Sequence, residues 1–189
     1  MLKRFSMMFL AVLLMFSFSM AQTDIGLKGV GGKLGYIMPD GDIENTLGFG
    51  AIVDLGHYND NIAVQAYVDY WGKDYDVGEY YEWSWSMLSI AAIAKYGFEA
   101  SGQFKPYAGG GLGLDIGSWD AKYTGPNSDF YGLGDFSDSG SESDLAIHLV
   151  GGATMELSPG LEGMAEVKYT IGDADYFGIY VGVIYSLDQ

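Results

Sequence analysis

The sequence predicts an all-β protein, an eight-stranded antiparallel transmembrane β-barrel with up-and-down topology. Two runs near the end of the chain, residues 161–170 and 176–187, alternate strictly between two faces. Such period-two alternation is typical of strands, and each run has about the ten residues that cross a bilayer at a tilt. One face carries no charge, whereas the other face of the first run carries Glu162, Glu166 and Lys168. This pattern fits lipid outside and a polar lumen inside.

The first three strands are expected at residues 27–38, 46–55 and 62–71. In each of them every second residue is mostly apolar, and these residues share one face. Pro, Asp and Gly at residues 39–42 form a turn signal after the first strand. Residues 72–83 then read as a longer loop. The charged side chains expected on the inward face of these strands are Lys33, Asp54 and Asp69.

The fourth strand, residues 84–98, has an alternative interpretation, because residues 87–94 are almost all apolar and fit a helix as well. Small inward residues in a narrow barrel explain the run equally well. The Ser-Trp-Ser segment at residues 84–86 favours a strand, which places Lys95 on the inward face.

The remaining strands are expected at residues 104–118, 144–157, 161–170 and 176–187. A tight Ser-Pro-Gly turn at residues 158–160 joins two of them. The charged side chains expected on their inward faces are Lys105, Asp115, Glu156, Glu162, Glu166 and Lys168.

The breaks between the strands alternate in length. Those after the second, fourth and sixth strands are short, whereas those after the third and fifth strands cover residues 72–83 and 119–143. Outer-membrane barrels have short periplasmic turns and longer outer loops, so both ends of the chain are expected in the periplasm. The outward aromatic residues then form two belts, as membrane interfaces require. The outer belt contains Tyr36, Phe49, Tyr70, Tyr169 and Phe177, and the periplasmic belt contains Tyr96, Phe98, Phe104 and Tyr185.

Residues 1–21 are expected to be a signal peptide, which leaves residues 22–189 as the barrel domain. A basic start and an apolar run too short for a spanning helix are followed by small residues up to Ala21. A membrane-anchoring helix is the alternative. Cleavage removes Lys3 and Arg4, so the formal charge of −16 becomes −18, and such a surface repels nucleic acid. The absence of cysteine excludes disulfides and thiolate metal sites.

Residues 105–113 read Lys-Pro-Tyr-Ala-Gly-Gly-Gly-Leu-Gly. This segment resembles the proline, tyrosine and glycine-rich strand of small eight-stranded outer-membrane proteins of the OmpA/OmpX kind. The resemblance implies a cell outer membrane location in a Gram-negative cell, export through a cleaved signal peptide, contact with outer-membrane lipid and lipopolysaccharide, and folding by the barrel-assembly machinery. Members of that family often end in an aromatic residue, whereas residues 186–189 follow Tyr185 here. No peptidoglycan-binding domain is expected after the eighth strand.

The inward charges are the first candidate site. An isolated buried charge costs several kcal/mol, and an eight-stranded barrel has room for little besides side chains, so these charges are expected to pair. We expect Glu156, Glu162, Lys95 and Lys105 to form a cluster at the periplasmic end. An ion-pair plug that fixes strand register is the favoured interpretation, and a narrow or gated ion path is the alternative. The expected network contains Lys33, Asp54, Asp69, Lys95, Lys105, Asp115, Glu156, Glu162, Glu166 and Lys168.

Acidic outer loops are the second candidate site. Asp40, Asp42 and Glu44 have the spacing of the start of a calcium loop, but its sixth and twelfth positions are Asn45 and Ala51. These three residues are therefore weak metal candidates. Solvated acidic loops are the favoured interpretation, and loose bridging of the loops to an anionic outer leaflet by divalent cations is the alternative.

Three further features favour structural roles. His148 faces the lumen, and Val150 stands where a lipid-modifying barrel would need a serine, so a packed histidine is favoured over a catalytic one. The glycines at residues 31–32 and 109–111 lack the helix that follows a phosphate-binding loop and are expected to allow close packing. The aromatic residues of the second outer loop are expected to extend the outer belt, with a partner-contact surface as the alternative: Tyr75, Tyr80, Tyr81 and Trp83.

Together these features predict a non-enzymatic outer-membrane barrel with a structural or surface-interaction role through acidic extracellular loops. The alternative is a passive pore or channel for small or hydrophobic molecules, and a lipid-modifying enzyme is less favoured. A soluble ligand-binding barrel would instead turn the apolar faces inward. No cofactor and no nucleic-acid partner is expected.

Overall fold

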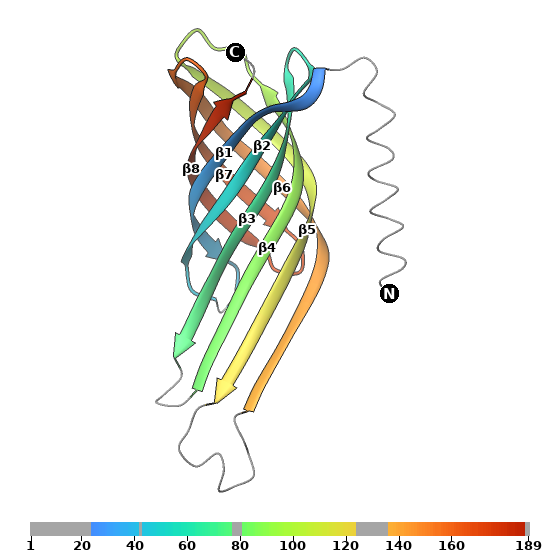
Figure 1. The fold of residues 1–189 in the computed structure, drawn as a ribbon, viewed down its shortest axis with the longest axis vertical. Coiled ribbons are helices and arrows are strands. Elements are labelled where there is room, and N and C mark those ends of the chain that lie inside the picture. The colour runs from blue at the N-terminus through green and yellow to red at the C-terminus, as the bar shows by residue number, and fades with distance from the viewer. Residues whose placement is uncertain (1–23, 42, 77–80, 124–135, 188–189) are drawn as a thin grey trace, which may run out of the picture.

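The computed structural model is a sheet of eight antiparallel strands closed into a barrel (Figure 1). The strands are β1 (Asp24–Pro39), β2 (Thr46–Asn59), β3 (Ile62–Asp76), β4 (Tyr81–Gly97), β5 (Phe104–Tyr123), β6 (Phe136–Ser158), β7 (Leu161–Ile171) and β8 (Tyr176–Ser186). The structure describes residues 24–41, 43–76, 81–123 and 136–187. Each strand pairs with the next, and β1 pairs with β8, so the predicted up-and-down barrel is confirmed. In the described part of the chain, no helix is long and apolar enough to cross a membrane.

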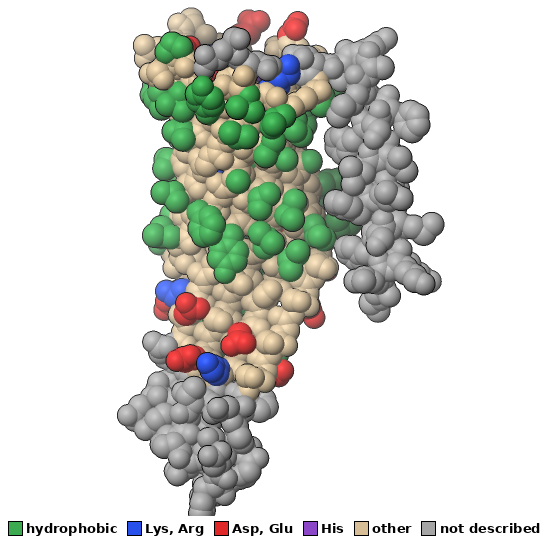
Figure 2. Space-filling view, viewed as in Figure 1, with side chains coloured by type: hydrophobic (Ala, Val, Ile, Leu, Met, Phe, Trp, Pro, Cys, Tyr) green, Lys and Arg blue, Asp and Glu red, His purple; other side chains and the backbone are tan. Residues whose placement is uncertain are grey.

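The alternation of each strand sorts its side chains between the two sides of the barrel wall. Leu112, Val181 and Ile90 point outward and expose 66%, 61% and 47% of their surfaces, whereas Ile93 and Tyr67 point inward and are buried. Figure 2 shows the outward apolar side chains as a band across the visible face of the barrel. A band of this kind has the surface that hydrocarbon tails can cover, so the predicted assignment of the faces is confirmed.

The outward aromatic residues gather toward the two ends of the band. Phe49 and Tyr70 are partners in register on β2 and β3, and their ring centroids lie 5.5 Å apart. Tyr96 and Phe98, near the end where β1 begins, have ring centroids 5.2 Å apart. Aromatic rings at these two levels are suited to the two membrane interfaces.

The helix considered for residues 87–94 is wrong, because this segment is the middle of β4.

Four strands run further than the sequence pattern predicted. They continue past the apolar band, at the lower end of Figure 1, as a four-stranded extension that we call the outer sheet. Its pairing reaches from Asp76 and Glu82 on one side to Tyr123 and Phe136 on the other. The loops predicted at residues 72–83 and 119–143 were therefore too long. The outer sheet consists of residues 72–76 of β3, 81–86 of β4, 118–123 of β5 and 136–146 of β6.

Buried side chains fill the lumen in two clusters. One is built around Ile52, Tyr67 and Ile93. The other is built around Trp71 and Tyr176 near the outer end, and the loop residues Ile43 and Ala174 pack against it. Six of the described inward charged residues are buried among these clusters, so they must find their partners within the protein: Lys33, Asp69, Lys95, Asp115, Glu166 and Lys168.

Candidate functional site

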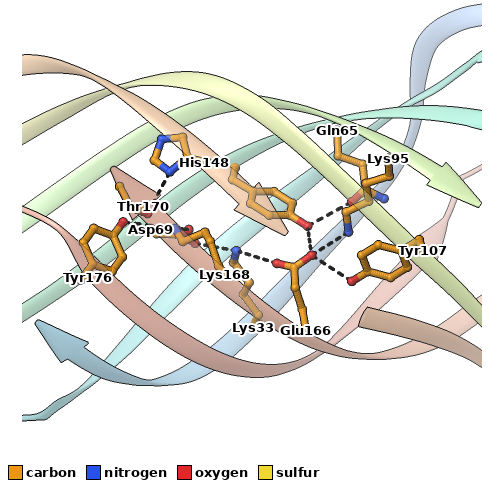
Figure 3. A network of polar contacts seen from close by, with 11 residues as sticks. Lys33, Gln65, Asp69, Lys95, Tyr107, His148, Glu166, Lys168, Thr170 and Tyr176 are labelled. Carbon is orange, nitrogen blue, oxygen red and sulfur yellow. Dashed lines mark hydrogen bonds and ion pairs between the residues drawn. The ribbon is translucent and has the colours of Figure 1, made fainter. Parts of the chain in front are cut away.

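The middle of the lumen holds a buried ion network centred on two carboxylates. The Asp69 carboxylate lies 2.6 Å from the Lys168 ammonium and 3.1 Å from the Lys33 ammonium. The Glu166 carboxylate lies 2.9 Å from the Lys95 ammonium and 3.7 Å from that of Lys33. No side chain of these five is more than 5% exposed. Because Lys33 contacts both carboxylates, the five residues form one network (Figure 3).

Tyrosines complete this network. The hydroxyl groups of Tyr67 and Tyr107 donate hydrogen bonds to the same Glu166 oxygen at 2.8 Å and 2.9 Å. The Lys33 ammonium lies 3.5 Å from the centroid of the Tyr67 ring, and the Lys95 ammonium lies 4.0 Å from that of Tyr107. Hydrogen bonds and ring faces of this kind replace part of the hydration that the buried charges have lost.

The strand register explains why these residues meet. Lys33, Gly50 and Asp69 lie side by side on β1, β2 and β3 and all face inward. A Cβ atom on Gly50 would overlap the Asp69 carboxylate and lie 3.0 Å from Cε of Lys33, so the absence of a side chain leaves room for this ion pair. On β7, Glu166 and Lys168 are two residues apart and therefore share the inward face.

A second group of buried polar residues lies beside the network. The Nδ1 atom of His148 is 3.0 Å from Oγ1 of Thr170, and its Nε2 atom is 3.8 Å from a carboxylate oxygen of Asp115. His148 is fully buried, as the sequence predicted for a packed lumen histidine.

Five of the ten residues expected in the lumen network come together in it, and five do not. Asp115 belongs to the group around His148. The Lys105 ammonium pairs with Glu162 at 3.4 Å at the exposed rim. The Asp54 carboxylate accepts a hydrogen bond from the Gly56 N–H at 2.8 Å. Glu156 is exposed, and within the described residues it makes no ion pair.

The expected four-residue cluster of Glu156, Glu162, Lys95 and Lys105 does not form, although its Lys105–Glu162 pair is present. Glu156 and Glu162 do lie opposite each other in register. Lys95, however, reaches along the lumen to Glu166, because two tyrosine hydroxyls hold that carboxylate in place. Sequence reasoning gave these tyrosines no role, although the alternation on their strands already predicted that Tyr67 and Tyr107 face inward.

Among the three acidic loop residues considered as metal ligands, Glu44 has a charged side-chain partner. Glu44 pairs with Lys73 at 3.0 Å, and the Glu44 carboxylate raises the pKa of the Lys73 ammonium above its ordinary value. The backbone N–H of Asp40 donates a hydrogen bond to the Asp175 carbonyl at 2.9 Å. Asp42 lies outside the described residues. Among the residues that are described, no three His, Cys, Asp or Glu side chains are placed to hold a metal ion.

The tryptophans lie on the inward face, three of them in the outer sheet and Trp71 directly before it on β3. Register and alternation put Trp71, Trp83, Trp85 and Trp119 on the face that continues the lumen wall. The ring centroids of Trp71 and Trp85 lie 4.7 Å apart, and those of Tyr75 and Trp83 lie 5.2 Å apart. Trp83 and Tyr75 were expected in the lipid-facing belt, and this expectation is wrong because both point to the inner side.

The two edges of the outer sheet differ. Beside the β3 edge, Oγ1 of Thr46, the first residue of β2, donates a hydrogen bond to the Gly72 carbonyl at 2.7 Å, and the Glu44 N–H donates one to the Tyr75 side-chain hydroxyl at 2.6 Å. On the β6 edge, pairing with β7 begins only at Ile147. Among the described residues, no strand pairs with residues 136–146 on this side.

A family comparison agrees with this architecture. Residues 8–186 match the family described as "Outer membrane protein beta-barrel domain". The chain belongs to this family. Membership of this family places the protein in the outer membrane and supports a general surface or structural role.

Solved structures of other outer-membrane proteins have the same fold as this chain. Neisserial surface protein A is 16% identical, with a TM-score of 0.63, and the match covers 86% of this chain and 98% of that one. Ail, the attachment invasion locus protein of Yersinia pestis, is 15% identical with a TM-score of 0.56 over 84% and 95% of the two chains. A major outer membrane protein of Thermus thermophilus is 12% identical with a TM-score of 0.59 over 86% and 100%. No curated protein sequence matches the chain.

Proposed function

We propose that the protein is a non-conducting, non-enzymatic barrel that presents the outer sheet as a contact surface on the cell exterior. The observation that carries the proposal is the combination of a filled lumen with strands that continue beyond the apolar band. A barrel that served only to span the membrane would have no need of four strands extended into water.

The filled lumen supports the non-conducting part of the proposal. Inward Tyr67, Ile93 and Lys168 are buried, and the network around Glu166 links side chains from opposite walls. Eight-stranded barrels have an interior that side chains can fill. An ion would have to break several charge-assisted contacts to pass, so the passive pore is the weaker of the two functions.

The acidity of the outer side supports a contact role with cations or basic partners. Exposed carboxylates on the outer sheet and loops include Asp74, Glu82 and Asp120. At the membrane surface these carboxylates are expected to bind divalent cations loosely, and the cations would bridge them to the anionic groups of lipopolysaccharide. A cleaved signal peptide and folding by the barrel-assembly machinery belong to the same proposal. The names of two proteins of similar fold, a surface protein and an attachment protein, agree with it.

Single-channel recording of the refolded protein in a planar bilayer tests the first part. We expect no discrete conductance steps. Regular steps that change in size when Lys95 or Lys168 is replaced by Met would contradict the proposal and favour the passive pore.

A shortened outer sheet tests the second part. Cells that carry the native protein are compared with cells that carry a variant lacking residues 73–85 and 118–140, each segment replaced by a short glycine–serine turn. We expect the variant to reach the outer membrane and to lose adhesion to protein-coated surfaces. Equal adhesion by both proteins, at equal surface levels, would reject the outer sheet as the contact surface.

A further inference from the structure

The inner face of β6 carries carboxylates at alternating positions along the outer sheet. Asp138, Glu142 and Asp144 face inward, because their register partners on β5 are Ala121, Gly117 and Asp115, and the first and last of these are buried. Asp138 and Glu142 are exposed and Asp144 is half-buried. No cation among the described residues lies within ion-pair distance of these three carboxylates.

An indole ring occupies the one gap in this series. Gly140 is the inward position between Asp138 and Glu142, and Trp119 is its register partner. A Cβ atom on Gly140 would lie 2.7 Å from Nε1 and 2.8 Å from Cε2 of Trp119, so the ring lies across the glycine. Trp119 is 36% exposed. Successive inward positions of a strand are about 7 Å apart. We call this series of carboxylate, indole, carboxylate and carboxylate the inner row: Asp138, Trp119 over Gly140, Glu142 and Asp144.

The inner row lies beside an edge that can accept another strand. Within the described ranges, residues 136–146 of β6 have no strand partner on the side away from β5, and Gly172 lies against Ala146 at one end of this stretch. On the β3 edge, by contrast, Thr46 and Glu44 donate hydrogen bonds to Gly72 and Tyr75. A strand added to the β6 edge would place every second side chain opposite one position of the inner row.

We propose that the inner row binds an extended segment of another protein that carries Lys or Arg at alternate positions. This inference rests on the proposed function of the outer sheet and names the chemistry of its partner. Opposite charges on directly paired strand positions stabilise the pairing, and an ammonium or guanidinium group over an exposed indole gains a cation–π contact. The spacing of the carboxylates selects alternation rather than basic charge alone.

A second copy of this chain fits the edge less well. Two β6 edges paired with each other would set carboxylates of one inner row against those of the other. Like charges placed directly opposite each other destabilise strand pairing. The acidity of the edge therefore opposes self-association and favours a basic partner.

Two synthetic peptides of identical composition test the alternation. In one, four Lys alternate with Thr, and in the other the four Lys are contiguous. Each carries a fluorophore and is titrated with the full-length protein refolded in lipid nanodiscs. We expect the alternating peptide to bind about tenfold more tightly, because three carboxylates of the inner row each gain an opposite partner. Equal binding of the two peptides would overturn the proposal.

Two triple variants with the same change in net charge test the location. The inner variant is Asp138→Asn, Glu142→Gln and Asp144→Asn. The outer variant is Asp74→Asn, Glu82→Gln and Asp120→Asn, whose side chains lie on the opposite face of the outer sheet. We expect the inner variant to lose about tenfold in affinity for the alternating peptide and the outer variant to lose less than about twofold. Equal losses would show attraction by net charge only and reject the inner row.

Charge reversal gives an independent readout. Asp138→Lys, Glu142→Lys and Asp144→Lys together should transfer the preference to a peptide in which Glu alternates with Thr, which also shows that the variant is folded. If shortening the outer sheet abolishes adhesion but no variant changes peptide binding, the inner row is rejected and the proposed function stands. If shortening leaves adhesion unchanged, the proposed function itself is rejected.

Discussion

The Lys168 ammonium lies 2.6 Å from a carboxylate oxygen of Asp69, although the two residues come from β7 and β3 on opposite walls of the barrel. The same ammonium also donates a hydrogen bond to the Tyr176 hydroxyl at 3.2 Å. Asp69 in turn contacts Lys33 on β1. Contacts of this kind join strands that are not neighbours in the sheet, so they fix the cross-section of the barrel as well as the register of each strand pair.

Replacing Glu166 with Gln should destabilise the barrel strongly. The substitution leaves the Lys95 and Lys33 ammonium groups without a carboxylate that both contact, and removing one partner of a buried ion pair costs about 3–5 kcal/mol. The matched control is Glu162→Gln on the same strand, whose exposed pair with Lys105 contributes less than about 1 kcal/mol. Urea unfolding of the protein in lipid vesicles measures both. Equal losses in the two variants would show that the lumen network adds nothing to stability.

A double-mutant cycle should detect coupling between Lys168 and Asp69. We expect each of Lys168→Met and Asp69→Leu to be costly, because each leaves a charge that has lost a buried partner. The double variant should cost less than the sum of the two by about 1–3 kcal/mol. The free energies of unfolding are measured in the same vesicles. Additive effects, within about 0.5 kcal/mol, would show that the short distance between the two groups carries no net interaction.

Gly50→Ala should disturb the ion pair beside it. The new methyl group overlaps the Asp69 carboxylate and lies 3.0 Å from Cε of Lys33, so the pair must shift, at a cost of about 1–3 kcal/mol. Gly32→Ala is the control, because a Cβ atom there meets only the Gly50 carbonyl at 3.8 Å, which is an ordinary contact. The folded fraction can be read from migration on a gel without boiling. Two variants that fold equally well would contradict the crowding at Gly50.

The parts of the fold that contact hydrocarbon could be predicted from the sequence. Along β8, Val181 meets lipid while Tyr180 and Ile184 line the lumen, and the strict alternation of such residues specified strand number, faces and closure. The outer sheet could not be found in this way. Water contacts the outer face of this sheet, so that face carries polar residues such as Ser84 and Ser86, while Trp85 between them faces inward. The outward apolar residues that mark a membrane strand are therefore absent.

The partners of the inward charges were harder to predict than their positions. Alternation correctly put Lys95 and Glu166 inside, but a lysine side chain is long enough to reach carboxylates at several levels of the lumen. The choice of Glu166 depends on the Tyr67 and Tyr107 hydroxyls, which hold the carboxylate from β3 and β5. Such a three-strand contact has no signature in any one segment of the sequence.

The tryptophans should respond differently to quenchers in lipid and in water. All four face the inner side of the wall, so lipids with brominated tails should quench the native fluorescence weakly. Leu112→Trp, at an exposed lipid-facing position, is the positive control and should add strongly quenched emission. Acrylamide in water should reach Trp119 far more readily than the buried Trp71, so Trp119→Phe should remove more acrylamide-sensitive emission than Trp71→Phe. Strong quenching of the native protein by brominated lipid would place tryptophans on the membrane face and would refute the inner face described for the outer sheet.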